Sequence, residues 1–216
     1  LGMNNWMSDP FEYPEKPLNR GKVLTAEDLK KAGEFARYKD VDGDGIPYRT
    51  LPGTDHPKAA YFTRGSGHNE KALYSERPED YQNLMERLAR KFETARTMVP
   101  APLVVQTGRS KVGVIAYGTS DFAVAESRDQ LKKEYGLEAD YLRIRAYPFA
   151  KEIHQFIASH ERVYVVEQNR DAQMLSLLKL DLPASETLKL RSVRHFNGLP
   201  IDARSVTDEI VLQEGI

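Results

Sequence analysis

The sequence contains no cysteine. Without thiols the chain cannot form a disulfide, ligate an iron–sulfur cluster, hold a thiolate-bound zinc ion or use a cysteine nucleophile. It also lacks a run of about 18 apolar residues, which a membrane-spanning helix needs. Its first residues have neither the charged nor the apolar region of a signal peptide. These absences predict a cytoplasmic protein with no membrane partner. The chain does not begin with Met, which favours a piece of a longer polypeptide.

An excess of charge of either sign is missing too. Lys and Arg number 31 against 32 Asp and Glu, so the formal net charge is −1, and both signs are spread evenly along the chain. This balance argues against a nucleic-acid partner, because binding to phosphates needs a basic surface. The hydrophobic content of 40% is enough for a core. The length of 216 residues allows one domain of about 110–150 residues and an additional segment.

Residues 1–77 carry many turn-forming residues and little periodic hydrophobicity, so we expect an irregular extension there, linked to a domain that precedes this chain. The exception is a short helix from Thr25 to Phe35, in which Asp28 completes an approximate capping box. From Pro78 onward, apolar residues recur at helical spacing and form one stripe. We predict a long helix there that leads the next domain and packs against it. The predicted division is therefore 1–77 and 78–216.

Short apolar runs alternate with amphipathic stretches after residue 100, which is typical of a parallel sheet covered by helices. The run Val112–Tyr117 is continuous and apolar, as in a strand buried on both faces. We predict an α/β fold with an open, mostly parallel five-stranded sheet and helices on both faces. The predicted strands are 103–106, 112–117, 141–146, 163–166 and 188–193, and the predicted helices are 120–135, 148–160, 169–179 and 202–213.

Polar turns follow three of these strands. In an open parallel sheet, ligands bind beyond the carboxyl ends of the strands, and helix N-termini attract anions. We therefore expect a phosphate or carboxylate ligand, or a subunit interface, at this edge. The candidates are Thr119, Ser120, Glu167, Asn169 and Arg170. The alternative is that Ser120 and Asn169 only cap helices, while Glu167 pairs with Arg170.

Two motifs in the N-terminal segment resemble binding loops without completing them. The Asp40–Gly45 segment matches the first half of a calcium loop, but Leu51 stands where a bidentate carboxylate is required, so a solvated turn is favoured. Gly43-Asp44-Gly45 followed by Asn69 mimics a thiamine diphosphate signature, yet no buried strand precedes it, and we reject that interpretation. The five histidines show no metal-ligand spacing. We assign no catalytic residue and no metal ligand.

A glycine-containing loop lies at residues 65–70. It has only two of the three glycines of a dinucleotide-binding loop, and no helix opens directly after it, so we do not predict a dinucleotide site. Arg64, Gly65 and His68 are candidates for contact with an anionic ligand or a neighbouring subunit.

Four blocks of the sequence resemble the alpha subunit of 2-oxoacid:ferredoxin oxidoreductases, most closely the 2-oxoglutarate type. They occur in the expected order and span nearly the whole chain. The blocks are Phe35–Gly53, Ala60–His68, Arg87–Ala95 and Val165–Gln173. The resemblance implies the C-terminal part of that subunit, whose last domain is similar to the C-terminal domain of transketolase.

The resemblance also implies an activity and its partners. The family converts a 2-oxoacid and coenzyme A to acyl-CoA and carbon dioxide, and it passes electrons through an iron–sulfur cluster to ferredoxin. Thiamine diphosphate with magnesium supplies the carbanion chemistry. The implied partners are the beta subunit and, through the complex, ferredoxin. No cofactor is expected on this chain, so the chain alone is expected to be inactive.

The same resemblance gives the candidate residues a role: they line a surface that closes the active site and meets coenzyme A, or they form the subunit interface. The residues are Arg64, Gly65, His68, Thr119, Ser120, Asn169 and Arg170. The alternative, from another class of function, is a purely structural assembly module with no ligand site of its own.

Overall fold

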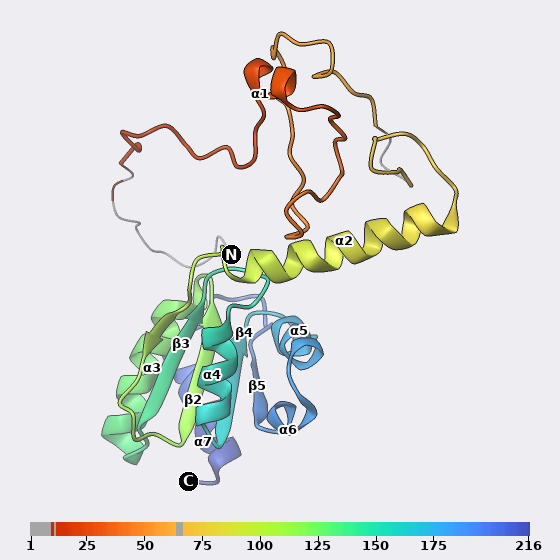
Figure 1. Ribbon diagram of the computed structural model, residues 1–216. Coiled ribbons are helices and arrows are strands. Elements are labelled where there is room, and N and C mark those ends of the chain that lie inside the picture. Colours follow the sequence, from red (N-terminus) through yellow and green to blue (C-terminus); the bar gives the residue numbers. More distant parts are fainter. Residues whose placement is uncertain (1–9, 11, 64–66) are drawn as a thin grey trace. The chain divides into compact units, whose positions relative to one another are not determined.

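The computed structural model describes residues 10, 12–63 and 67–216. These residues form two compact units, which divide between Met98 and Val99. The N-terminal unit contains α1 (Ala26–Lys31), α2 (Pro78–Arg96) and long loops, and the second unit contains a sheet with its helices (Figure 1). None of the helices in the described ranges combines the length and the apolar character that a membrane span requires.

One five-stranded sheet organises the second unit. Its strands are β1 (Leu103–Val105), β2 (Val112–Tyr117), β3 (Ala139–Ile144), β4 (Arg162–Glu167) and β5 (Leu190–Arg194). They lie in the order β1-β3-β2-β4-β5. Strands β2 to β5 are parallel, whereas β1 pairs with β3 in the antiparallel direction at the edge (Figure 1). The prediction of an open, mostly parallel five-stranded sheet is confirmed.

Helices cover both faces of this sheet. They are α3 (Ser120–Tyr135), α4 (Lys151–Ser159), α5 (Gln173–Asp181), α6 (Ala184–Thr187) and α7 (Ala203–Glu214). Val114 of β2 belongs to an apolar cluster with side chains of α3 and α7, whereas its neighbour Ile115 belongs to a cluster with side chains of α4 and α5. Alternate side chains of a strand point to opposite faces, so both faces of β2 are buried and its sequence is apolar throughout. The predicted coverage of both faces is confirmed.

Some element boundaries differ from the prediction because tertiary contacts outweigh the local pattern. β3 begins at Ala139 rather than Tyr141, although the polar Asp140 interrupts the apolar run. The Asp140 carboxylate is buried, accepts a hydrogen bond from the Thr107 amide at 2.8 Å and lies 3.2 Å from Nε2 of His160. A polar residue with such partners fits inside a buried strand. α4 and α5 also begin later than predicted, at Lys151 and Gln173.

The N-terminal unit begins its first helix as predicted. At the start of α1, the Asp28 amide donates to Thr25 Oγ1 at 3.2 Å, and the Thr25 amide donates to Asp28 Oδ2 at 2.8 Å. This capping box satisfies two amides that lack partners within the helix. The helix ends at Lys31, before the predicted Phe35.

Helix α2 is held by the loop at residues 40–45. Arg87 Nη1 donates to the Gly45 carbonyl at 3.1 Å, Thr94 Oγ1 donates to the Asp44 carbonyl at 2.6 Å, and Arg90 Nε donates to Asp40 Oδ2 at 3.1 Å. These contacts explain why α2 groups with the N-terminal unit. The predicted division between residues 77 and 78 assigns this helix to the following domain, whereas the structure divides the chain after Met98.

The predicted apolar stripe of α2 is not its buried side. Tyr81, Met85 and Phe92 are exposed, and the buried residue of this helix is Arg87. Hydrophobic periodicity identified the helix correctly, but the contacts with the 40–45 loop are made by its polar face.

Candidate functional site

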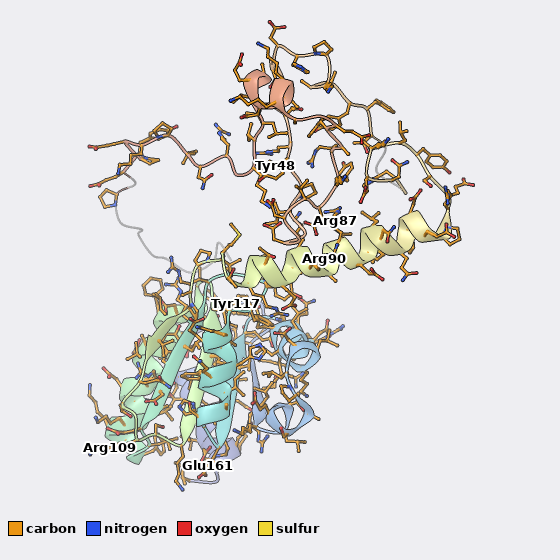
Figure 2. All side chains as sticks on the ribbon, viewed as in Figure 1. Tyr48, Arg87, Arg90, Arg109, Tyr117 and Glu161 are labelled. Carbon is orange, nitrogen blue, oxygen red and sulfur yellow. The ribbon has the colours of Figure 1, made fainter. Side chains whose placement is uncertain are left out.

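Two of the predicted turns meet at the carboxyl edge of the sheet. β2 and β4 are parallel neighbours, so Tyr117 and Glu167 end their strands on the same side. Gln168 Nε2 donates to Thr119 Oγ1 at 3.2 Å and to Ser120 Oγ at 3.1 Å, which joins the two turns. Figure 2 labels Tyr117 at this edge, and Arg109 and Glu161 at the opposite end of the sheet. The structure therefore brings Thr119 and Ser120 together with the turn after β4.

The side chain of Glu167 points into the protein, so it is not available to contact a ligand at the surface. Its side chain is fully buried. The carboxylate accepts hydrogen bonds from Asn169 Nδ2 at 2.6 Å, from the Met174 amide at 2.8 Å and from the Leu175 amide at 3.2 Å. A carboxylate at the first turn of a helix satisfies amides that have no partner within it. Glu167 thus anchors the start of α5 and explains why this helix begins at Gln173.

Asn169 and Arg170 complete this turn. Asn169 Oδ1 accepts hydrogen bonds from the amides of Asp171 and Gln173, at 3.1 and 3.2 Å. Arg170 is exposed and pairs with Asp171, Nε to Oδ1, at 2.7 Å. The predicted alternative of a Glu167–Arg170 ion pair is wrong. The predicted caps are also wrong, because the N-cap residues of α3 and α5 are Thr119 and Ala172, although Asn169 does accept from the first amide of α5. In this turn, Arg170 and its partner Asp171 are exposed to solvent, and Gln168 and Asn169 are half-buried.

A second polar cluster lies beside the N-terminus of α3. Arg143 Nη1 lies 2.9 Å from Asp121 Oδ2, and the Tyr141 hydroxyl donates to Asp121 Oδ1 at 2.6 Å. Burial and the hydrogen bond to Asp121 raise the pKa of Tyr141 well above its usual range. Burial, followed by the nearby Glu167 charge, raises the pKa of Tyr117 as well. Both phenols therefore stay protonated, and the Tyr141 hydroxyl gives its one donor to Asp121.

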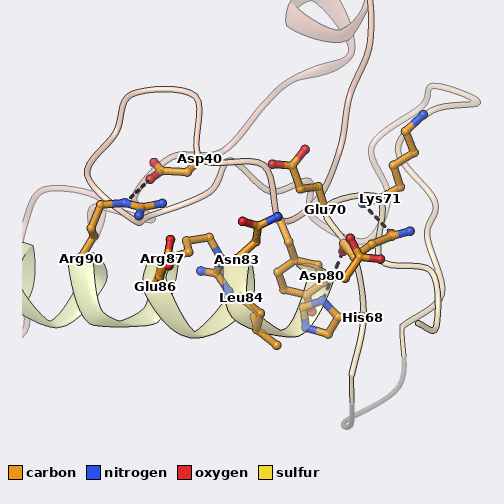
Figure 3. A pocket seen from close by; sticks show the side chains of 12 residues that line it. Asp40, His68, Glu70, Lys71, Asp80, Asn83, Leu84, Glu86, Arg87 and Arg90 are labelled. Carbon is orange, nitrogen blue, oxygen red and sulfur yellow. Dashed lines mark hydrogen bonds and ion pairs between the residues drawn. The ribbon is translucent and has the colours of Figure 1, made fainter. Parts of the chain in front are cut away.

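The N-terminal unit contains a pocket of about 440 Å³ between α2 and two loop segments (Figure 3). It is lined by Tyr38, Asp40, His68, Asn69, Glu70, Lys71, Asp80, Asn83, Leu84, Glu86, Arg87 and Arg90. The candidate His68 lies in this pocket, where its ring stacks on Tyr38 with a centroid distance of 3.9 Å. The other two candidates of that loop, Arg64 and Gly65, fall outside the described residues.

Two arginines, Arg87 in the lining of the pocket and Arg37 outside it, lie close to the ring of Tyr38. The guanidinium of Arg87 lies 5.7 Å and that of Arg37 lies 4.8 Å from the centre of the Tyr38 ring. Burial, together with repulsion from Arg37, lowers the pKa of Arg87. Within the part of the chain that the structure describes, neither arginine has a carboxylate within ion-pair distance.

The acidic residues of the calcium-like segment have basic partners. Lys22 Nζ lies 2.6 Å from Asp42 Oδ2 and 2.6 Å from Asp44 Oδ2, and Arg90 pairs with Asp40. Among residues 10, 12–63 and 67–216, no group of three His, Asp or Glu side chains is placed to hold a metal ion.

Sequence reasoning missed three residues that organise these places, namely Gln168, Arg37 and Arg87. A signal was available, because each of them lies within one of the blocks that carry the family resemblance. The sequence gives no reason to single out these three residues within the blocks. Metal ligands can be recognised by their spacing along the chain, but no such spacing identifies a functional amide or guanidinium.

Sequence similarity to known proteins extends over most of this chain. The sequence is 26% identical over 206 residues, 92% of this chain, to the 2-oxoacid:ferredoxin oxidoreductase subunit alpha of Saccharolobus solfataricus. It is 25% identical over 205 residues, 91% of this chain, to subunit alpha of 2-oxoacid:ferredoxin oxidoreductase 1 of Sulfurisphaera tokodaii. The chain spans 30% of the length of each of these relatives. No family model matches it.

Among solved structures, the fold is similar to that of the 2-oxoglutarate:ferredoxin oxidoreductase from Magnetococcus marinus, which was solved with 2-oxoglutarate, coenzyme A and succinyl-CoA bound. The match covers 84% of this chain and 31% of the other chain, with a TM-score of 0.71 and 21% identity. At this identity the match shows the fold. A split-gene transketolase matches 50% of this chain and 39% of its own, with 16% identity and a TM-score of only 0.40. The predicted likeness to the transketolase C-terminal domain therefore stays a prediction. The predicted family resemblance is confirmed by the sequence matches: over most of its length, this chain is similar to the alpha subunits of 2-oxoacid:ferredoxin oxidoreductases.

Proposed function

We propose that this chain is the C-terminal part of the alpha subunit of a 2-oxoacid:ferredoxin oxidoreductase of the 2-oxoglutarate type. The complete enzyme would convert the 2-oxoacid and coenzyme A to acyl-CoA and carbon dioxide, with ferredoxin as electron acceptor. The observation that carries the proposal is the 26% identity to the Saccharolobus subunit over 92% of the chain. The Magnetococcus fold match supports it.

The cofactors of this chemistry would be held outside this chain. The sequence has no cysteine, so its residues do not fit an iron–sulfur cluster. The described residues likewise offer no group of three acidic or histidine side chains for the magnesium ion that accompanies thiamine diphosphate. We therefore assign both cofactors to the other domains and the beta subunit. The chain's own contribution would be subunit assembly, active-site closure and contact with coenzyme A.

The carboxyl edge of the sheet is the surface that we assign to this contribution. It presents the exposed guanidinium of Arg170 and the half-buried amides of Gln168 and Asn169. Thr119 and Ser120 lie behind them and hold Gln168 in place. Guanidinium and amide groups suit the phosphates and amides of coenzyme A, and a preorganised polar surface also suits a subunit interface.

Copurification tests the assignment of the chain to the enzyme. A tag on the C-terminus of this polypeptide in its own cells should bring down 2-oxoglutarate-dependent ferredoxin reduction that requires coenzyme A. The isolated 216-residue chain should show no such activity, because the cofactor sites are elsewhere. Activity in the isolated chain, or none in the purified complex, would contradict the proposal.

Kinetics of the complex separate a coenzyme A surface from a purely structural assembly module. Arg170→Ala should raise the KM for coenzyme A, with kcat unchanged, since it removes ground-state binding. Arg109→Ala, an exposed arginine at the opposite end of the sheet, is the matched control. An unchanged KM together with a lower yield of assembled complex would favour the assembly module.

A further inference from the structure

We propose that the pocket between α2 and the segments at residues 38–40 and 68–71 binds a small molecule through an oxyanion, a phosphate or a carboxylate, with Arg87 as its anchor. This inference is independent of the proposed function, because it rests only on the N-terminal unit.

The first argument is that the buried guanidinium of Arg87 has no ion-pair partner among the described residues. Its side chain is 7% exposed, and its one hydrogen bond among the described residues runs from Nη1 to the Gly45 carbonyl at 3.1 Å. A guanidinium has five N–H donors, so most of its donor capacity remains unused. A buried charge without an ion-pair partner is unfavourable, and the nearby Arg37 adds repulsion, which the Asp40 carboxylate offsets in part. A bound oxyanion would relieve both effects.

The second argument is that the acidic residues of the pocket are mostly engaged with other groups. Asp40 pairs with Arg90 at 3.1 Å and also accepts from the Gly45 amide at 3.0 Å. Asp80 accepts from Ser75 Oγ at 2.6 Å, and Glu86 accepts from Gln82 Nε2 at 2.8 Å. These hydrogen bonds occupy oxygens of all three carboxylates, and the ion pair with Arg90 neutralises Asp40.

The remaining acidic residue, Glu70, is exposed, and Figure 3 shows its carboxylate directed away from α2. Lys71 also lines the pocket, and its ammonium pairs with Glu34 at 2.8 Å. Arg90 pairs with Asp40, so Arg87 is the one basic side chain of the pocket that has no ion-pair partner among the described residues.

The third argument is the size and the wall of the pocket. A volume of about 440 Å³ exceeds that of a lone oxyanion and suits a small organic molecule. The stacked rings of Tyr38 and His68 provide a flat wall. The Asn83 amide on α2 also lines the pocket and has no hydrogen-bond partner among the described residues, so it can donate to the ligand.

Calorimetry on the 216-residue chain tests this inference with inorganic phosphate and malonate as probes, each against sodium chloride of equal ionic strength. We expect one of the probes to bind with a Kd in the millimolar range or below, and to raise the Tm of the N-terminal unit. Phosphate binding alone would identify a phosphate ligand, and malonate binding alone a carboxylate ligand. Either result supports the proposal, whereas heats equal to those of chloride for both probes would overturn it.

Variants locate the binding at Arg87. Arg87→Gln should weaken it at least tenfold, and Arg87→Lys, which keeps the charge without the planar fork, should weaken it less. Asn83→Asp adds a negative charge to the pocket without touching the contacts of Arg87 and should also weaken binding at least tenfold. Ala89→Asp adds the same charge at an exposed position of α2 outside the lining, and Arg109→Gln removes an arginine of the other unit. Equal affinity in Asn83→Asp and Ala89→Asp would overturn the assignment, even if Arg87→Gln failed to fold.

Discussion

Gly45 determines how closely the loop at residues 40–45 can approach α2. Its φ is +78°, in the left-handed region, and a Cβ atom added there would lie 2.7 Å from the Arg87 carbonyl oxygen and closer still to the Lys91 amide nitrogen. Both of these are backbone atoms of a helix and cannot move aside. Gly43, in the same loop, has nearly the same φ, +77°, but nothing lies within 4 Å of the position of its Cβ. Alanine at Gly43 would therefore add backbone strain alone, whereas alanine at Gly45 would add both backbone strain and a steric clash with α2.

The expected magnitudes follow from these contacts. Alanine in the left-handed region costs about 1 kcal/mol relative to glycine, and this is the whole expected effect of Gly43→Ala. Gly45→Ala must in addition push the loop away from α2. This breaks the hydrogen bonds from Arg87 to the Gly45 carbonyl and from Thr94 to the Asp44 carbonyl, each worth about 1 kcal/mol or more. We expect a total loss of about 3–4 kcal/mol in the free energy of unfolding of this unit.

Native-state hydrogen exchange of the α2 amides measures this loss locally, so the stability of the sheet-containing unit does not obscure it. Gly45→Ala should lower the protection of these amides about 30-fold or more relative to Gly43→Ala, since each factor of ten corresponds to about 1.4 kcal/mol. Equal protection in the two variants would refute the reasoning, because it would mean that the loop does not rest on the helix backbone.

Two further predictions concern carboxylates of the sheet-containing unit that each accept several hydrogen bonds. Glu167→Gln should destabilise this unit by about 2–3 kcal/mol in urea unfolding, because it removes the charge that accepts three hydrogen bonds at the start of α5. The exposed Glu161→Gln is its control and should cost less than about 1 kcal/mol, and an equal cost for both would contradict the burial argument. For Glu214, burial alone would raise the pKa, but hydrogen bonds from Arg162 and Tyr164 outweigh it, so the pKa of the folded state is lowered. Its stabilisation is complete above the ordinary Glu pKa and is lost as the pH falls through the folded value. Glu214→Gln should therefore cost about 1–3 kcal/mol at pH 7 and progressively less in acid, and a difference independent of pH would contradict this account.

Much of the fold was readable from local patterns, for reasons that particular elements illustrate. Val112–Tyr117 is apolar at every position, which only a strand buried on both faces requires, and β2 is such a strand. The Thr25 capping box forms because both of its bonds are local. The polar turns after three of the strands are predicted to lie at one edge of the sheet, because parallel strands end on the same side, and the turns after β2 and β4 do lie there.

The candidate sites are harder to predict from the sequence, because they depend on which surfaces of the folded chain come into contact. Nothing local shows that Glu167 turns inward to the amides of α5 or that Gln168 reaches across to Thr119 and Ser120. The apolar stripe of α2 likewise reports which residues are apolar and not what covers them. The loop at residues 40–45 instead packs on the opposite, polar side and buries Arg87.

The sequence by itself determined the class of fold, the absence of any thiol chemistry and the family that the chain resembles, because these depend on composition, on local periodicity and on the order of short blocks. Only the tertiary structure decided that the acidic loop at residues 40–45 packs on α2, that Glu167 caps a helix and that Arg87 lines a pocket without a carboxylate partner among the described residues. The physical reason is that a charged side chain takes its role from the partners around it, and those partners are distant in the chain.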